Sequence, residues 1–286
     1  MRRLRELASS REILANLVRK EVKVKYKSSV LGALWSMLNP VLYLAVFTLV
    51  FSVVLRNDIR DFPVYLLSGL LAWNLFSTSL SLASRSVVDN ANLVTKVYFP
   101  REILPLSSVG TALVDFGLQA LVLVAFMVTS GYDFTRIDLL LLPLSMFALL
   151  AFTSALGMWV AGLNVRYRDT QHLLNLSLLA WFWVTPIVYP SGFVYTELSS
   201  REFLGIRLFD LYLANPMASV VMGFQRALYG TVSYPVEGGR EVFVLAPVSL
   251  GWLALLIGGV AVGSLLLLFL AWRTFFHLSG DFAEEL

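Results

Sequence analysis

The fold of this chain is decided by residues 19–47, RKEVKVKYKSSVLGALWSMLNPVLYLAVF. The stretch begins with five basic residues: Arg19, Lys20, Lys23, Lys25 and Lys27. No Lys or Arg then follows until Arg56. Basic side chains resist burial in hydrocarbon, and those that flank a membrane span stay on the cytoplasmic side. The stretch therefore predicts a membrane boundary, a cytoplasmic N-terminus and a candidate docking surface.

The composition of the whole chain also indicates an integral membrane protein. Of its 286 residues, 58% are hydrophobic and only 14% are charged, and the mean hydropathy is +0.75. A soluble domain is about half apolar and about a quarter charged, so we expect lipid to solvate the excess. The absence of cysteine excludes disulfides, thiol nucleophiles and thiolate metal sites. The N-terminal 29 residues contain no apolar core of signal-peptide length, so we expect no cleavable signal.

Six apolar stretches approach the ~20 residues that a helix needs to cross the hydrocarbon core. We predict an all-α polytopic membrane protein with spans near 31–55, 64–84, 103–130, 138–163, 171–190 and 243–272. The expected parts are an amphipathic helix in 1–29, a six-span domain in 30–272, a cytoplasmic loop at 85–102, an extracytoplasmic segment at 191–242 and a cytoplasmic tail at 273–286.

The distribution of Lys and Arg tests this topology. The N-terminus holds nine, the 85–102 loop three, the 164–170 loop two and the C-terminal tail one, which gives fifteen on one side. The opposite side holds the other seven of the 22. Because Lys and Arg are enriched in cytoplasmic segments, we expect both termini inside.

Two cytoplasmic segments are candidates for contacts with another protein. Apolar residues at three- and four-residue spacing, interleaved with basic ones, predict an amphipathic helix along the inner membrane face; they are Ile13, Leu14, Leu17, Val18 and Val22. The alternative is a topology anchor only. In the 84–102 segment, apolar residues such as Tyr98 and Phe99 lie where no lipid solvates them. They suit a protein contact or, alternatively, packing against the chain's own helices.

The outer segment and the apolar spans contain a few unusual residues. Residues 211–230 are apolar at helical spacing but contain Asn215-Pro216, so we expect short helices at or dipping into the outer interface. Asp115 is an acid inside the third expected span, without an intramembrane basic partner in the sequence. We expect a structural hydrogen bond from it to a neighbouring helix. Pro186 should distort the outer half of the fifth span.

Aromatic residues are dense around Trp181-Phe182-Trp183. Interfacial belts or packing explain such residues by type alone, and a glycan path is the alternative, because aromatic faces stack on sugars. The sequence contains no phosphate-binding G-x-x-x-x-G-K-[ST] loop, no H-E-x-x-H and no G-x-S-x-G. We therefore expect no enzyme activity in this chain, and uphill transport would need energy from another polypeptide.

Several blocks, in order along the chain, resemble one family. They are KVKYKSSVLGALWSMLNPVL (23–42), YLLSGLLAWNLFSTSL (65–80), NLVTKVYFPREILPLSSV (92–109), YRDTQHLLNLSLLAWFWVTPIVYP (167–190), ANPM (214–217) and FFHLSGDFAEEL (275–286). The chain resembles the transmembrane permease of an ATP-binding-cassette exporter of lipid-linked polysaccharide, of the O-antigen type, or of teichoic acid.

The resemblance implies a half-transporter: a homodimer of twelve spans in a bacterial cytoplasmic membrane, bound by two copies of a separate ATPase subunit. That partner would bind ATP and Mg, with no cofactor or metal in this chain. The N-terminal helix matches the family's interface helix, the 85–102 loop its coupling helix and the segment after Pro190 its re-entrant outer helices.

The resemblance also assigns roles to residues. The residues expected to contact the ATPase are Asn92, Leu93, Val94, Lys96, Val97, Tyr98, Phe99, Pro100, Arg101 and Glu102, with Arg166, Arg168 and Asp169 from the 164–170 loop. The expected substrate path is lined by Tyr43, Phe47, Trp181, Trp183 and Tyr189, to which we add Trp73. Two alternatives stay open: an exporter of drugs or simple lipids on the same fold, and a membrane scaffold that anchors a cytoplasmic enzyme.

Overall fold

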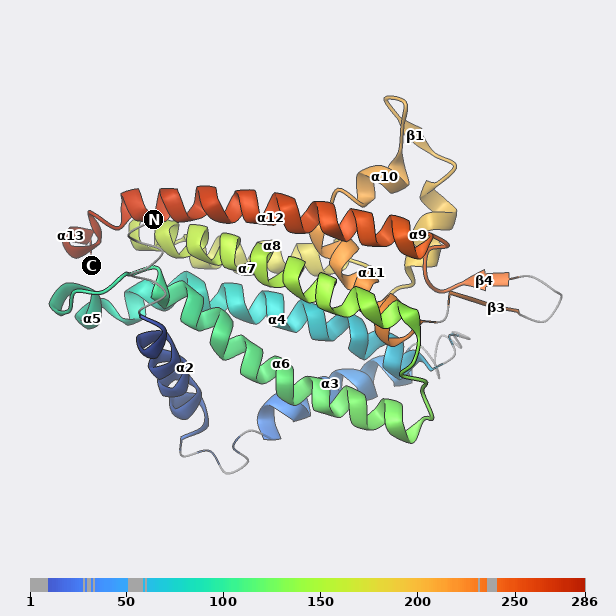
Figure 1. The fold of residues 1–286 in the computed structure, drawn as a ribbon, viewed down its shortest axis with the longest axis horizontal. Coiled ribbons are helices and arrows are strands. Elements are labelled where there is room, and N and C mark those ends of the chain that lie inside the picture. Colours follow the sequence, from blue (N-terminus) through green and yellow to red (C-terminus); the bar gives the residue numbers. More distant parts are fainter. Residues whose placement is uncertain are drawn as a thin grey trace.

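Four long apolar helices form the body of the structure, a computed structural model that describes residues 10–27, 29, 32, 34–50, 59, 61–230, 232–235 and 241–285. Within these residues, the helices long and apolar enough to cross a membrane are α4 (Phe62–Asp89), α6 (Ile103–Thr129), α7 (Leu141–Arg166), which the 3-10 turn η2 (Ile137–Leu140) precedes, and α12 (Leu250–Leu278). A helix of ~27 residues is about 40 Å long, which exceeds a hydrocarbon core of ~30 Å. The four run along the long axis of the molecule (Figure 1).

The long helices differ in how far other parts of the protein cover them. The most apolar window of α4 is 72% buried and has a mean hydropathy of 1.3, whereas that of α12 is 22% buried with a mean hydropathy of 2.6. A helix surrounded by protein can carry polar groups that pair with its neighbours, but a helix that faces lipid must be apolar outward. α4 is therefore the central helix and α12 a peripheral one.

Shorter elements surround the long helices. The helices are α2 (Arg11–Tyr26), α3 (Leu34–Thr48), α5 (Ala91–Lys96), α8 (Thr170–Val184), α9 (Ser191–Leu198), α10 (Leu208–Tyr212), α11 (Pro216–Leu228) and α13 (Phe282–Glu285). Two antiparallel hairpins pair β1 (Glu202–Phe203) with β2 (Ile206–Arg207) and β3 (Ser233–Pro235) with β4 (Glu241–Phe243). Figure 1 shows α5 and α13 at one end of the molecule, here the α5 end, and α9 with β3–β4 at the other, here the α9 end.

The predicted helical membrane fold is confirmed as a mostly helical structure, to which the two hairpins are an unforeseen addition. α4, α6 and η2–α7 lie over the expected second, third and fourth spans. Of the expected first span, the structure describes α3 and the residues that follow it to Val50, and residues 51–55 lie outside the described part of the chain.

Two helices have other bounds than expected. The span expected at 171–190 is helical only to Val184, because Thr185 precedes Pro186 and takes an extended conformation that ends α8. The span expected at 243–272 begins instead at Leu250, where the Ser249 hydroxyl accepts a hydrogen bond from the Trp252 amide. That helix continues to Leu278, into the segment expected as a tail.

Helix α11 is almost wholly buried between α4, α7 and α12. Asn215 caps its start by accepting from the Met217 amide, and Pro216 occupies the first turn, where a missing amide hydrogen costs nothing. Residues 216–228, which were expected to form a short helix at or dipping into the outer interface, therefore form a helix that the long helices enclose.

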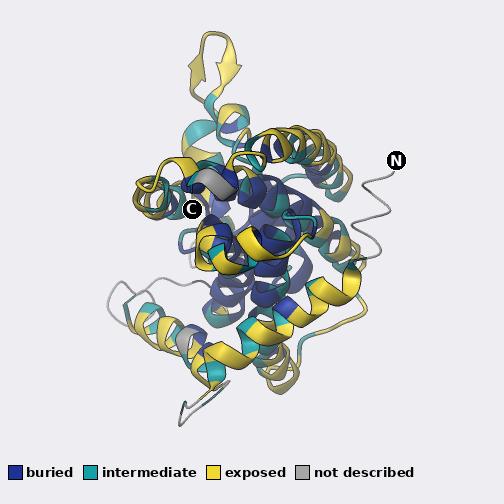
Figure 2. Cartoon of the chain, turned by 90° about the vertical axis from the view of Figure 1, so that its left-hand side faces the viewer, coloured by how far each residue is buried: buried dark blue, intermediate teal, exposed yellow. Residues whose placement is uncertain are grey.

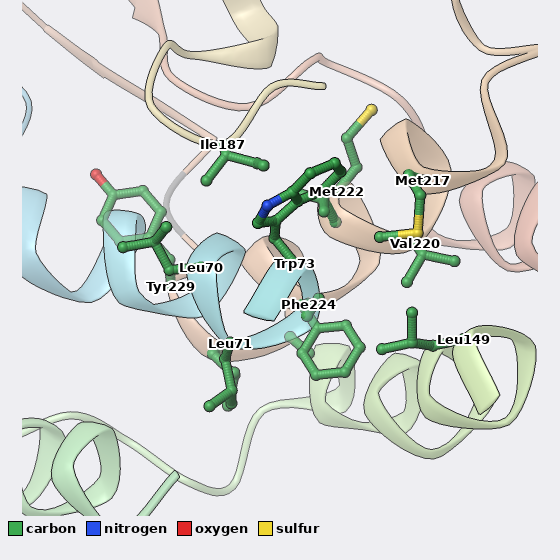
Figure 3. Close-up of a cluster of buried hydrophobic side chains, with 14 of the residues drawn as sticks. Leu70, Leu71, Trp73, Leu149, Ile187, Met217, Val220, Met222, Phe224 and Tyr229 are labelled. Atoms are coloured by element: carbon green, nitrogen blue, oxygen red, sulfur yellow. The ribbon is translucent and has the colours of Figure 1, made fainter. Parts of the chain in front are cut away.

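Hydrophobic packing is concentrated along the axis of the bundle. The main cluster joins α4, α7 and α11, and Figure 3 shows Trp73, Leu149, Ile187, Met217 and Phe224 converging within it. Figure 2, which looks along the bundle from the α5 end, shows buried residues in the centre and exposed ones on the outward faces of the helices.

Candidate functional site

A second hydrophobic cluster, separate from the main one, lies at the α5 end. It brings together residues from α2, α4, α5, α6, α7, α12, α13 and the loop after α5; they are Leu17, Val87, Val94, Phe99, Ile103, Leu104, Ala161, Val165, Phe275 and Phe282. We call this set the α5-end cluster. Packed side chains transmit a displacement because a dense interior has little free space to absorb it. The short helix α5 is therefore mechanically connected to all four long helices and to α2.

The apolar residues of the 84–102 segment divide into an inward set, which packs on the fold, and an outward set, which is exposed to solvent. Val94 and Phe99 lie in the α5-end cluster, and Phe99 is only 8% exposed. Val97 and Tyr98 point outward, and Tyr98 is 97% exposed. Of the two readings that the sequence left open, packing on the chain's own helices therefore holds for Val94 and Phe99. The outward set is centred on Tyr98.

The charged end of this loop is tied to the C-terminal helix. Glu102 is buried and its Oε1 accepts a hydrogen bond of 3.1 Å from Trp272 Nε1. Arg101 Nη1 donates to the backbone oxygen of Ser279. Sequence reasoning assigned Arg101 and Glu102 to a partner surface and missed Trp272, whose indole N–H in an aliphatic helix requires an acceptor. These two residues anchor the loop to α12.

The loop between α7 and α8 lies at the same end. Arg166 Nε lies 3.7 Å from Glu285 Oε1, which ties the end of α7 to α13. Arg168 and Asp169 are exposed, as are Asn92 and Lys96 of α5. The polar residues expected at a partner contact are therefore at one end of the molecule, and Asn92, Lys96, Arg168 and Asp169 are exposed there.

Helix α2 docks on α6 through a close contact at a glycine. A Cβ atom at Gly110 would lie 2.7 Å from Cγ2 of Val18, so only glycine lets the two helices approach this far. At the outer edge of α2, Lys20 Nζ donates to Asn90 Oδ1 over 3.0 Å. The other basic residues Arg19, Lys23 and Lys27 are exposed, as expected for a helix on a membrane surface.

Asp115 of α6 is the centre of a polar cluster that joins α2 to the start of α3. Lys25 Nζ lies 2.6 Å from Asp115 Oδ2, and the Tyr26 and Ser36 hydroxyls donate to Oδ1 over 2.8 and 3.1 Å. The side chain of Asp115 is 9% exposed and that of Lys25 is 43% exposed. The predicted hydrogen bond to a neighbouring helix is confirmed, and the basic partner, which the spans do not supply, comes from α2 outside them. Burial raises the pKa of the Tyr26 hydroxyl, so that it remains a donor to the carboxylate.

The α9 end has its own polar clamp, which sequence reasoning missed. Arg136 donates to the last carbonyls of α11: Nη1 to Tyr229 O over 3.1 Å, and Nη2 to Ala227 O and Leu228 O over 3.2 and 3.0 Å. These carbonyls have no partners within the helix, and a cation there also opposes the negative end of the helix dipole. Arg226 Nε, one turn back, lies 3.1 Å from Asp138 Oδ1. The sequence did contain one indication of this contact: Arg226 is a charged residue in an apolar stretch, and such a residue requires a partner when it is buried.

The aromatic residues expected on a substrate path also divide into two sets. Trp73 is 6% exposed and packs edge-on to Phe182 with ring centroids 5.6 Å apart. Trp181 is half-buried, and its Nε1 donates to Asn215 Oδ1 over 2.8 Å. Trp73 and Trp181 are therefore both held by other side chains of the fold.

The outward aromatic residues lie on α3 and at the end of α8. Tyr43 is exposed and stacks on Phe47 with centroids 6.1 Å apart. Trp183 is exposed too, and its backbone oxygen accepts a 3.0 Å hydrogen bond from the Tyr189 hydroxyl. Within the described residues, no group of three His, Asp or Glu side chains is placed to hold a metal ion.

Comparison with known proteins gives one consistent result. Residues 13–229 match the family described as ABC-2 type transporter. The O-antigen export system permease protein RfbA of Myxococcus xanthus is 34% identical over 249 residues, which is 87% of this chain and 91% of that one. The protein of the same name from Klebsiella pneumoniae is 30% identical over 224 residues, 78% of this chain and 83% of its own. The polysialic acid transport protein KpsM of Escherichia coli is 25% identical over 178 residues, 60% of this chain and 67% of that one.

Proposed function

The chain belongs to the ABC-2 type transporter family and is a permease subunit for polysaccharide export, and we propose that it moves a lipid-linked glycan outward across a bacterial cytoplasmic membrane. The observation that carries this proposal is the family match over residues 13–229 of an integral membrane protein. The glycan would be of the O-antigen, capsule, teichoic acid or galactan class.

The proposed arrangement is a homodimer with six spans in each chain and both termini in the cytoplasm. The α5 end would then be cytoplasmic and the α9 end extracytoplasmic. The excess of Lys and Arg in the segments expected in the cytoplasm supports this orientation, because α5 and the loop after α7 are among those segments. In such a dimer, α3 and α8 would supply the wall of the path, with Tyr43 and Trp183 facing the glycan. Their exposed rings support this assignment, because an aromatic face binds sugars without holding them by charge.

The energy would come from two copies of an ATP-binding-cassette subunit, which bind ATP and Mg outside this chain. The docking surface would be the outward set of α5 and its loop, centred on Tyr98. A push on Tyr98 would displace α5, and the α5-end cluster would pass the displacement to the ends of α6, α7 and α12. Helix α2 would follow through Val18 and the Lys25–Asp115 contact, which ends beside the start of α3.

Depletion of the protein tests the proposed function directly. With the permease removed, we expect surface polysaccharide to disappear and its lipid-linked precursor to accumulate in the cytoplasmic leaflet. Normal surface polymer with no trapped precursor would refute the proposal. Expressing either the wild-type chain or a Trp183→Ala variant from a plasmid in the depleted cells tests the proposed substrate path. The wild-type chain should restore export, whereas the variant should reach the membrane but export less polymer.

A further inference from the structure

The β1–β2 hairpin has an apolar tip that neither the family match nor the proposed path explains. Its register places Phe203 opposite Ile206, so Leu204 and Gly205 form a two-residue turn. Phe203 and Ile206 are exposed, and Leu204 is 87% exposed. Three large apolar side chains therefore lie together in solvent at the end of a narrow hairpin, where water alone would favour polar residues.

The backbone of the turn makes the choice of leucine more unusual. Leu204 has φ = 53° and Gly205 has φ = 77°, the pair of positive values that a type I′ turn requires. Asn, Asp or Gly adopt this conformation easily, whereas leucine is strained in it. The sequence thus places an apolar side chain at the tip against the preference of the backbone. Strain of this kind points to a function of the side chain.

The direction of the hairpin places this tip at the level of the membrane surface. Figure 1 shows β1–β2 projecting across the long axis of the bundle, beside the end of α12 where that helix begins, and Figure 2 shows it projecting away from the bundle in the view along that axis. Because the long helices cross the membrane, an element that extends sideways at their ends runs along the bilayer surface. The β3–β4 hairpin instead extends along the bundle axis, away from the membrane (Figure 1).

We propose that the Phe203–Leu204–Ile206 tip inserts into the headgroup and upper acyl region of the leaflet at the α9 end and anchors the α9–α10 segment to lipid. A few apolar side chains suffice for such insertion, because the rest of the chain already holds the hairpin at the membrane. A tip of this size is far smaller than the ~800 Å² per partner of a stable protein interface. The inference rests on the membrane placement of the chain and is independent of the exported glycan.

The charges around the tip indicate whether apolar or electrostatic attraction would hold it in the membrane surface. Arg201 pairs with Glu197 at 3.4 Å and Arg207 with Asp210 at 2.9 Å, and Glu202 lies opposite Arg207 in the hairpin. Two arginines among three carboxylates leave no positive excess, so anionic lipids should give no advantage. The attraction is therefore apolar.

A fluorescent label at the tip tests the anchor in the full-length protein. The chain contains no cysteine, so Leu204→Cys gives one labelling site for an environment-sensitive dye. The protein is reconstituted into phosphatidylcholine vesicles, with and without lipids that carry a spin label near the headgroup end of the acyl chain. We expect blue-shifted emission and loss of most of it to the spin label, to the same extent when phosphatidylglycerol is added. The matched control is Glu241→Cys on β4, which should emit as in water and resist quenching.

Two outcomes would overturn the proposal. Emission at position 204 that matches the control and is not quenched would place the tip in water. Disulfide-linked dimers of unlabelled Leu204→Cys, together with a lack of lipid quenching, would place it against a second copy of the chain. A Leu204→Asn variant adds a second test: asparagine suits the turn, so the hairpin keeps its shape, yet a dye at Phe203→Cys in this background should lose its quenching by lipid. Retained quenching would contradict a role for Leu204, and neither result depends on polysaccharide export.

Discussion

The two ends of the molecule each use an acid–base pair to hold a short helix against the long ones, but the pairs are built differently. At the α9 end, Asp138 and Arg226 are both largely buried, and Arg136 adds three hydrogen bonds to the end of α11. At the α5 end, Asp115 is buried but Lys25 reaches it from a half-exposed position on a flexible stem. A planar guanidinium with several fixed acceptors allows one arrangement, whereas a single ammonium contact can break and re-form. The comparison indicates a rigid frame around α11 and an adjustable connection at α2.

Removing Arg136 should have the largest effect on stability. Arg136→Met leaves the final carbonyls of α11 without donors, and we expect a loss of about 2–4 kcal/mol, since hydrogen bonds from charged groups contribute about 1.5–3 kcal/mol each and are not additive. Thermal unfolding of the purified protein, followed by tryptophan fluorescence, measures the change. The control is Arg85→Met, whose ion pair with Asp89 is exposed and should contribute less than about 1 kcal/mol. Equal stability of the two variants would show that α11 does not depend on Arg136.

Removing Lys25 should lower the stability less than removing Arg136 does, but it should weaken the coupling between ATP hydrolysis and export more. Lys25→Met leaves the Asp115 carboxylate with only hydroxyl donors, and because the lysine is half-exposed we expect about 1–2 kcal/mol, below the ~3–5 kcal/mol of a fully buried pair. A double variant, Lys25→Met with Asp115→Leu, removes the unpaired charge and should recover much of that stability. If the connection transmits motion, however, the double variant should still hydrolyse ATP in complex with its partner while exporting less glycan.

The ratio of exported polymer to ATP hydrolysed is therefore the measurement that decides the role of this cluster. A double variant with normal stability and a normal ratio would make the Lys25–Asp115 contact a structural one only. A lowered ratio at normal stability would show that the Lys25–Asp115 contact transmits motion and does not act only by stabilising the fold.

A smaller effect is expected where α2 touches α6. Gly110→Ala places a Cβ against Val18, a β-branched side chain with few rotamers, and we expect a loss of about 1 kcal/mol and looser docking of α2. Gly117→Ala, on the same helix, meets nothing within 4 Å and should be neutral or slightly stabilising. Faster proteolysis of α2 in Gly110→Ala than in Gly117→Ala would support the contact. Identical digestion of the two would show that α2 is held elsewhere.

What the sequence could predict follows from the physics of each signal. Hydrocarbon requires long apolar helices, so α4, α6 and α7 could be located by composition, and Pro186 and Asn215-Pro216 locally dictate where α8 ends and where α11 begins. Partnerships between distant residues have no such local signal. The contacts of Asp115 with Lys25 and of Glu102 with Trp272 join residues that are 90 and 170 positions apart, and only the packing of the helices brings them together.

The division of the α5 loop was unpredictable for a related reason. Val94 and Phe99 are as apolar as Val97 and Tyr98, and a helix of only 6 residues followed by a short loop is too short for its periodicity to distinguish an inner face from an outer one. The distinction comes from Leu17, Phe275 and other residues of distant helices, which form the cluster that buries Val94 and Phe99.

The smallest effect on stability is expected at the outermost residue of that loop. Tyr98 is almost fully exposed, so Tyr98→Ala should change the free energy of unfolding by no more than about 0.5 kcal/mol. If Tyr98 is a central contact of the ATPase, the same change should weaken binding of the partner by about 2 kcal/mol, roughly thirtyfold, as truncation of a buried interface aromatic does. Titration of the purified partner against permease in nanodiscs measures this, with Leu266→Ala on the exposed face of α12 as the control. Unchanged affinity would show that the ATPase does not dock on α5 and its loop. Weaker binding at unchanged stability would support a contact of the partner with the outward residues Val97 and Tyr98, while the buried Val94 and Phe99 stabilise the fold.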